Sequence, residues 1–153
     1  MIHFSEIVGD WPLDEGALTW LRQAYLPDQE RKLHAVLRKV GHLNGKAYNL
    51  DFNVDVRLEL KGEKWNGLSG EFIPMTMPWT IKIYWPREMD SSDSLFNRIV
   101  MHEMCHLYAL MNSEVMATAG HGVKEDFMVK AINQFISEAY PAGHWSWPGT
   151  VGN

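Results

Sequence analysis

Two histidines and a glutamate lie close together in the chain, at His102, Glu103 and His106. In a helix, residues four positions apart lie above one another on one face, so the two imidazoles could point at a single metal ion. Glu103 would stand beside them, close enough to exchange a proton with a water at the metal. This H-E-x-x-H pattern therefore predicts a zinc site with hydrolytic chemistry, provided that a helix carries it.

The sequence around the motif predicts such a helix over about 93–111. Two largely apolar lines run along it: Leu95, Ile99, His102, His106 and Leu110, and Phe96, Val100, Met104, Leu107 and Met111. A helix that is apolar on most sides is expected in the middle of a domain. Histidines buried there need polar partners, and a shared metal ion would satisfy both. The alternative is a pair of hydrogen-bonded core histidines.

Catalytic zinc usually has three protein ligands, so one more is expected outside this helix. The candidates are His121, Glu125, Glu114 and His144. His121 is preferred, because imidazole suits zinc and the two flanking glycines let the backbone approach closely. Glu125 is the second choice, since helical carboxylates complete many sites of this kind.

Two helices are expected before the motif. Asp14 can cap a helix over about 15–26, which Pro27 would end. Asp28 can cap a second helix that reaches about Val40. Both segments carry an apolar stripe at helical spacing, so each is expected to pack against the core.

The strands are expected between these helices and the motif. Residues 48–60 alternate apolar and polar side chains, and shorter strands are predicted at 70–73 and 80–85. Residues 1–12 show no clear period and are expected to form an entry loop, whereas 124–139 predicts a last helix. The predicted fold class is α+β, with N-terminal helices, a small antiparallel sheet, the central motif helix and a C-terminal helix.

The composition predicts one globular domain over residues 1–153, with 46% hydrophobic and 22% charged residues. No signal peptide or membrane span is recognisable, so a cytoplasmic protein is expected. Cys105 is the single cysteine, which excludes an internal disulfide and a cysteine-based zinc ribbon. It stands off the line of the two histidines and is expected to pack in the core.

The formal net charge of −5 argues against a surface that binds nucleic acid as a whole. A local basic face is predicted on the second helix, where Arg31, Lys32, Arg38 and Lys39 recur at a spacing of seven. A solvated helix face is the simpler interpretation. Contact with DNA phosphates is the alternative.

If the site binds zinc, Glu103 is predicted to act as the catalytic base in peptide hydrolysis. An extended substrate could pair with an edge strand near 79–85, since strand addition supplies main-chain hydrogen bonds. Tyr108, Tyr140 and His144 are candidates for stabilising the oxyanion. A zinc-bearing binding module without catalysis, associated with nucleic acid or a larger assembly, is the competing function.

The motif at 102–106, followed by Gly120-His121-Gly122 and then by Ile132-Asn133, resembles the SprT-like, or Spartan-type, zinc metalloprotease domain. The expected order of helices and sheet is also similar to that domain. No cysteine follows the motif helix, so the zinc ribbon that many members append is not expected.

The resemblance implies a zincin-like minimal metalloprotease with Zn2+ as its cofactor. His102, His106 and His121 would be the zinc ligands, and Glu103 would be the catalytic base. It also implies a protein or peptide substrate, with DNA-associated proteins as the substrate class.

Overall fold

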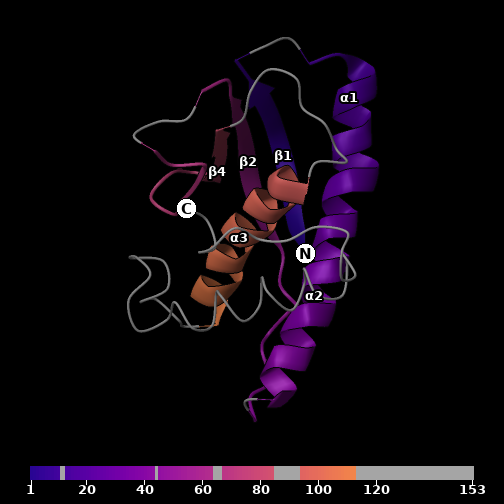
Figure 1. Ribbon diagram of the computed structural model, residues 1–153, viewed down its shortest axis with the longest axis vertical. Helices are drawn as coiled ribbons and strands as arrows, with labels where there is room; N and C mark the ends of the chain where they lie inside the picture. The colour runs from indigo at the N-terminus through magenta and orange to yellow at the C-terminus, as the bar shows by residue number, and fades with distance from the viewer. Residues whose placement is uncertain (11–12, 44, 64–66, 85–93, 113–153) are drawn as a thin grey trace.

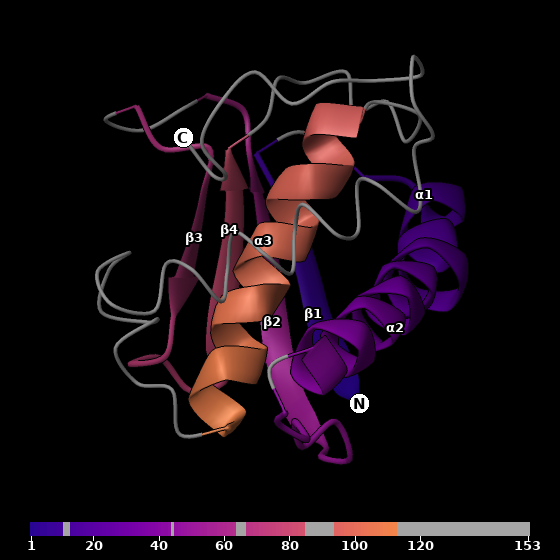
Figure 2. The same ribbon diagram turned by 60° about the horizontal axis from the view of Figure 1, so that its bottom comes forward.

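The computed structural model describes residues 1–10, 13–43, 45–63, 67–84 and 94–112. Its elements, in chain order, are β1 (Ile2–Gly9), α1 (Glu15–Trp20), η1 (Leu21–Tyr25), α2 (Leu26–Leu43), β2 (Val54–Lys61), β3 (Gly70–Ile73), β4 (Trp79–Tyr84) and α3 (Ser94–Met111). The long helix α3 lies across one face of the sheet, and α2 lies beside it (Figures 1 and 2). Among the described residues, no helix has the length and apolar character to cross a membrane.

The four strands form one sheet in the order β1-β2-β4-β3. β1 pairs with β2 and β2 with β4 in parallel, and only β3 and β4 are antiparallel. The α+β class is confirmed, but the prediction of an antiparallel sheet is wrong for two of these three pairings. Helices between β1 and β2 make the crossover that parallel neighbours require.

The sequence does not predict the parallel pairing, because residues 1–12 show no clear period and predict a loop where the structure has β1. Ile2, Phe4 and Ile7 are buried in the core, but a register shift between Phe4 and Glu6 interrupts the strand. Such a bulge inserts one residue and moves the following apolar side chain out of the alternation. The period of two is therefore lost within the first seven residues.

The first helical region differs from the prediction at Pro27. Asp14 caps α1 as expected, accepting a hydrogen bond from the Ala17 amide at 2.7 Å. The chain then continues through the π-helical turn η1 into α2, so Pro27 does not end a helix and Asp28 is not a cap. A proline ring clashes with the carbonyl four residues earlier in an α-helix, and the wider π turn changes that spacing.

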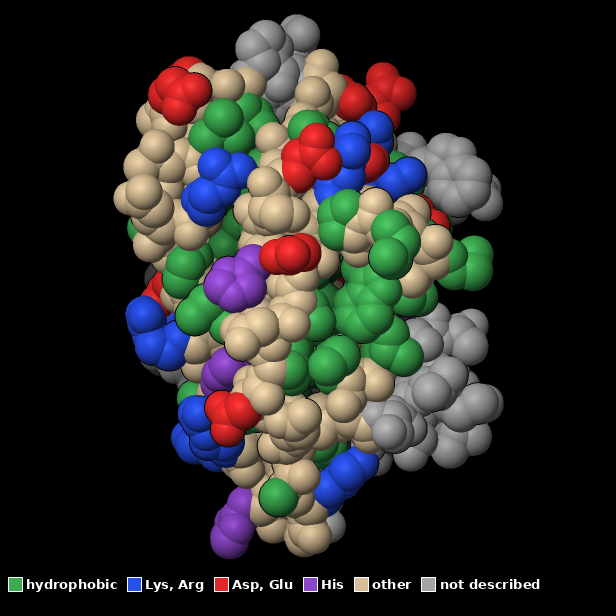
Figure 3. All heavy atoms as spheres, turned by 180° about the vertical axis from the view of Figure 1, so that it is seen from behind, with side chains coloured by type: hydrophobic (Ala, Val, Ile, Leu, Met, Phe, Trp, Pro, Cys, Tyr) green, Lys and Arg blue, Asp and Glu red, His purple; other side chains and the backbone are tan. Residues whose placement is uncertain are grey.

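The two faces of the sheet differ in character. Its inner face is apolar, with Val56, Leu58, Leu60, Ile81 and Ile83 buried against the helices. On its outer face, acidic and basic side chains lie close together (Figure 3). There the Glu59 carboxylate forms ion pairs with Arg57 at 3.0 Å, Lys61 at 3.6 Å and Lys82 at 3.8 Å.

Two predictions concern the strands nearest the motif. The strand predicted at 48–60 is shorter than expected and begins only at Val54. The expectation that the strand near 79–85 lies at an edge is wrong, because β4 is hydrogen-bonded to β2 on one side and to β3 on the other. Among the described strands, β3 is the one at the edge of this end of the sheet.

The predicted last helix, 124–139, lies outside the described residues.

Candidate metal centre

The motif helix is confirmed: α3 covers Ser94–Met111, within one residue of the prediction. It carries His102, Glu103 and His106 into the interior, where their residues are 3%, 4% and 8% exposed. One ligand atom from each of the three lies within 4.8 Å of the others. The structure thus brings together two imidazoles and a carboxylate in a place that is largely closed to water.

The spacing of the two imidazoles fits a shared ion. His102 Nε2 and His106 Nε2 are 3.1 Å apart. Two nitrogens that each lie about 2.0–2.1 Å from a tetrahedral zinc ion are separated by about 3.3 Å. The helix therefore presents its two nitrogens almost at the separation that zinc requires. The same distance also allows one imidazole to donate a hydrogen bond to the other, which is the core-pair alternative.

Glu103 lies beside this pair, with Oε1 3.9 Å from His102 Nε2. Burial, and to a smaller extent the charge of Glu71, raise the pKa of the Glu103 carboxyl to about 8. A carboxylate in water is a weak base, whereas a pKa near the working pH favours proton transfer in both directions. The surroundings of Glu103 are therefore those of a group that can take up and release a proton.

Gly70, the first residue of β3, makes the position of Glu103 possible. A Cβ atom at Gly70 would lie 2.9 Å from Glu103 Cγ and 2.9 Å from Ile99 Cγ2, closer than real Cβ contacts. Only glycine lets α3 approach the strand this closely. The sequence gives only a weak sign of this role, since a glycine inside a strand pattern can signal a close approach of another element.

Tyr108 was a candidate oxyanion donor, but its hydroxyl is engaged elsewhere. It donates to Glu30 Oε2 on α2 at 2.6 Å and also contacts His34 Nε2. Burial and the Glu30 hydrogen bond raise the pKa of the Tyr108 hydroxyl. Tyr108 is two positions after His106, about 200° round the helix, so it faces α2 instead of the candidate metal centre.

Glu30 is a buried residue that the sequence analysis did not single out. Its Oε2 accepts a hydrogen bond from the Ile2 amide at 2.7 Å as well as from Tyr108. The carboxylate therefore joins β1, α2 and α3 at one point. Buried carboxylates persist where several donors satisfy them, and this one fixes the helix that carries the motif against two neighbouring elements.

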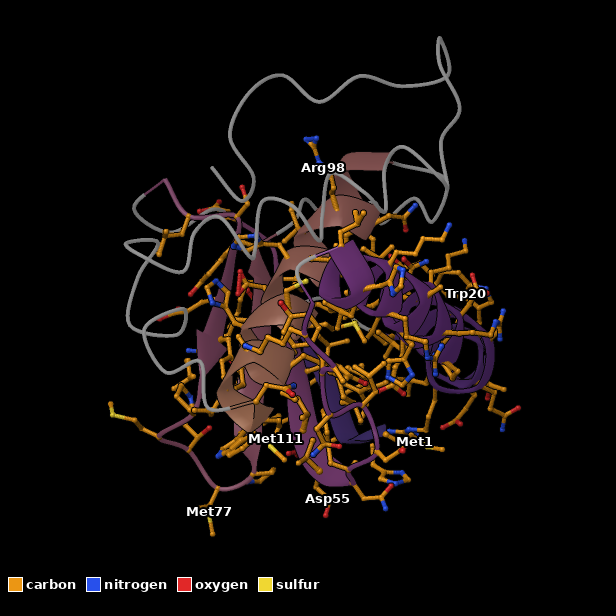
Figure 4. The ribbon with its side chains drawn as sticks, turned by 90° about the horizontal axis from the view of Figure 1, so that it is seen from below. Met1, Trp20, Asp55, Met77, Arg98 and Met111 are labelled. Atoms are coloured by element: carbon orange, nitrogen blue, oxygen red, sulfur yellow. The ribbon has the colours of Figure 1, made fainter. Side chains whose placement is uncertain are left out.

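Arg98 lies one turn before His102 on α3 and is also fully buried. Its side chain extends away from the sheet near the start of the helix, whereas Met111 marks the other end (Figure 4). Burial lowers the pKa of its guanidinium. The motif therefore lies between a buried cation on one side and the α2 contact of Tyr108 on the other.

Cys105 packs in the core as predicted, and its side chain is completely buried. Burial raises the pKa of its thiol, so the sulfur stays protonated at neutral pH. The other candidate ligands and oxyanion donors, His121, Glu125, Glu114, His144 and Tyr140, lie outside the described residues. The third ligand therefore remains a prediction.

Comparison with models of protein families gave no match for the chain, and comparisons with curated proteins and with solved structures gave none either.

Proposed function

We propose that the chain is a zinc-dependent endopeptidase of SprT-like type. The observation that carries this proposal is the pair of imidazole nitrogens 3.1 Å apart, with a buried carboxylate 3.9 Å from one of them. Structural zinc sites need ligands but no neighbouring base. A carboxylate held beside such a pair suits the hydrolysis of a peptide bond, because it can take a proton from the attacking water and pass it on.

In this mechanism His102 and His106 would hold the ion, and His121 is the predicted third ligand. Bound there, zinc would supply Lewis acidity and lower the pKa of a water to about 7. Glu103 Oε1 accepts a proton from the water that attacks the peptide carbonyl. The same carboxyl then delivers the proton to the departing amine, which returns Glu103 to its carboxylate form.

The substrate is proposed to bind in extended form along β3. The outer edge of β3 offers main-chain donors and acceptors, since among the described strands β3 pairs only with β4. The first residue of β3 lies directly against Glu103. A peptide added to this edge would gain main-chain hydrogen bonds and place a carbonyl near the carboxylate.

Removing the metal tests this function. The zinc-loaded chain is expected to degrade an unfolded protein such as casein, and a chelator should abolish turnover because both imidazoles then lack their common ion. Adding back one equivalent of zinc should restore it. Turnover and bound zinc would be measured on the same samples. A chain that binds one zinc but cleaves no unfolded protein or peptide would exclude the peptidase.

One observation favours the competing function, a non-catalytic zinc-bearing module. The motif residues are at most 8% exposed, and structural zinc sites are closed in this way. A substrate that cannot reach the carboxylate cannot be hydrolysed. The same experiment separates the two functions, because the module would bind zinc and be stabilised by it without any turnover.

DNA-associated substrates are proposed only as an extension of this function. Arg31, Lys32, Arg38 and Lys39 are all exposed on α2, as a phosphate-binding face requires. However, Asp28 forms ion pairs with both Arg31 and Lys32, which reduces the charge that the face offers.

Reversing the charge at all four basic positions tests this extension. If the face binds DNA, the substitutions should weaken salt-dependent DNA binding by roughly tenfold or more and reduce the slope of log K against log salt. Affinity would be measured by fluorescence anisotropy between about 50 and 200 mM salt. Unchanged affinity and slope would remove the basic face as a DNA contact.

A further inference from the structure

Glu71 lies on the edge strand, one residue after the glycine that contacts Glu103. Successive side chains of a strand point to opposite faces. Because the Cβ direction of Gly70 points to α3, the side chain of Glu71 points to the outer face of the sheet. Figure 2 shows β3 as the outermost strand on the side of α3 away from β1. Glu71 is therefore the acidic side chain of the strand on which the substrate is proposed to bind.

The charge of Glu71 is not balanced by a cation among the described residues. Its carboxylate accepts a hydrogen bond from the Tyr84 hydroxyl at 2.9 Å, which is a neutral donor. Lys82 is its partner in the strand register, but the Lys82 ammonium lies 3.8 Å from Glu59 instead. Glu59 thus holds three cations while Glu71 holds none of them.

A peptide strand added to β3 would place one side chain directly beside Glu71. Cross-strand neighbours on the same face have Cβ atoms about 4.5–5.5 Å apart, and opposite charges at such pairs attract. A lysine or arginine at that position would provide the cation that Glu71 lacks. An aspartate or glutamate there would be repelled by the negative charge of Glu71. Water screens this charge only in part, because Glu71 is half-buried, and the Tyr84 hydroxyl holds the carboxylate in position.

We propose that Glu71 is a specificity residue that selects a lysine or arginine in the substrate, at the position next to it on the edge strand. This inference rests on the proposed peptidase function and names its substrate class: extended segments with a basic side chain close to the cleaved bond.

The test uses the zinc-loaded full chain and a set of unstructured peptides that differ at one position. A single lysine is moved through the positions flanking the cleaved bond, and glutamine replaces it in a matched set. Wild-type kcat/KM should favour lysine over glutamine by about three- to tenfold at one flanking position. Glu71→Gln should remove this preference, mainly through KM, and Glu71→Lys should reverse it toward glutamate.

Glu6→Gln provides the matched control, because Glu6 lies on β1, the opposite edge strand, where it pairs with Arg57. It should keep the full preference for lysine. Equal cleavage of all peptides by the wild type, or a preference that survives Glu71→Gln, would overturn the inference and leave the peptidase standing. A zinc-bound wild type that cleaves no peptide would instead overturn the function, and the inference with it.

The wild-type protein supplies a second measurement that does not depend on the folding of any variant. Raising the salt concentration from about 0.05 to 1 M should shrink the preference for lysine toward unity, because an ion pair near the surface is screened. Cleavage of the glutamine peptides should change much less. A preference for lysine that is insensitive to salt would contradict a charge interaction at Glu71.

Discussion

Replacing Glu103 with glutamine is expected to leave zinc bound while peptide hydrolysis falls by about 10²–10⁴-fold. Glutamine keeps the shape of the side chain that packs against Gly70, and it leaves both imidazoles in place. It cannot accept a proton at the site where Oε1 lies 3.9 Å from His102 Nε2. General base catalysis contributes about this factor when a positioned group moves the proton. Turnover of a flexible peptide and zinc content would be measured together.

His106→Ala is the comparison that separates the base from the ligands. This variant removes one of the two imidazoles, so zinc binding and turnover should be lost together. Glu103→Gln should lose turnover alone. A Glu103→Gln protein that keeps more than a tenth of wild-type kcat would show that another group moves the proton. Loss of zinc from Glu103→Gln would make Glu103 a ligand instead.

The wild type and Glu103→Gln are also expected to differ in stability when both are free of metal. The folded pKa of Glu103, about 8, lies above its ordinary value of 4.5, so the folded state holds the proton more tightly than the unfolded chain. The free energy of unfolding of the metal-free wild type should therefore fall as the pH rises from about 4.5 to about 8, by at most about 5 kcal/mol. Glu103→Gln should lack this part of the pH dependence in urea unfolding at fixed pH values.

The sequence predicted the motif helix well because its evidence is local. Two apolar lines repeated at helical spacing over 93–111 required burial on most sides, and every side chain from Phe96 to Ala109 is indeed buried. Helical geometry alone then placed His102 and His106 side by side. The part of the site that one helix determines was therefore readable from one stretch of sequence.

The rest of the site depends on pairs of residues that are far apart in sequence. Glu30 and Tyr108 are separated by 78 positions, and neither shows its partner in a local pattern. The register that places Gly70 against Glu103 depends on β3 pairing with β4 and on α3 crossing that pair. The sequence does not predict the parallel pairing for a related reason. The bulge in β1 interrupts the alternation of apolar and polar residues that would mark this segment as a strand. Such contacts follow from topology, which periodicity does not specify.

Gly70→Ala tests whether this close approach matters for the chemistry. The added Cβ would lie 2.9 Å from both Glu103 Cγ and Ile99 Cγ2, and 3.2 Å from Glu103 Cδ. Ile99 is β-branched, buried and unable to move far, so the Glu103 carboxylate is expected to shift. We expect kcat to fall by about 10–100-fold, because small displacements of a catalytic group are costly, and unfolding to become easier by about 1–3 kcal/mol.

Zinc binding should survive Gly70→Ala, since the three nearest contacts of the new Cβ belong to Glu103 and Ile99 and not to the imidazoles. Gly16→Ala is the matched control. Gly16 is exposed on α1, and its new Cβ would meet only Asp14 Oδ1, at 3.3 Å. This control should leave kcat unchanged and slightly favour the helix. If Gly70→Ala destabilises the chain but keeps kcat, the glycine serves packing alone. If it lowers kcat while zinc stays bound, the edge strand holds the carboxylate in its catalytic position, and a proteolytic site must be described as helix and strand together.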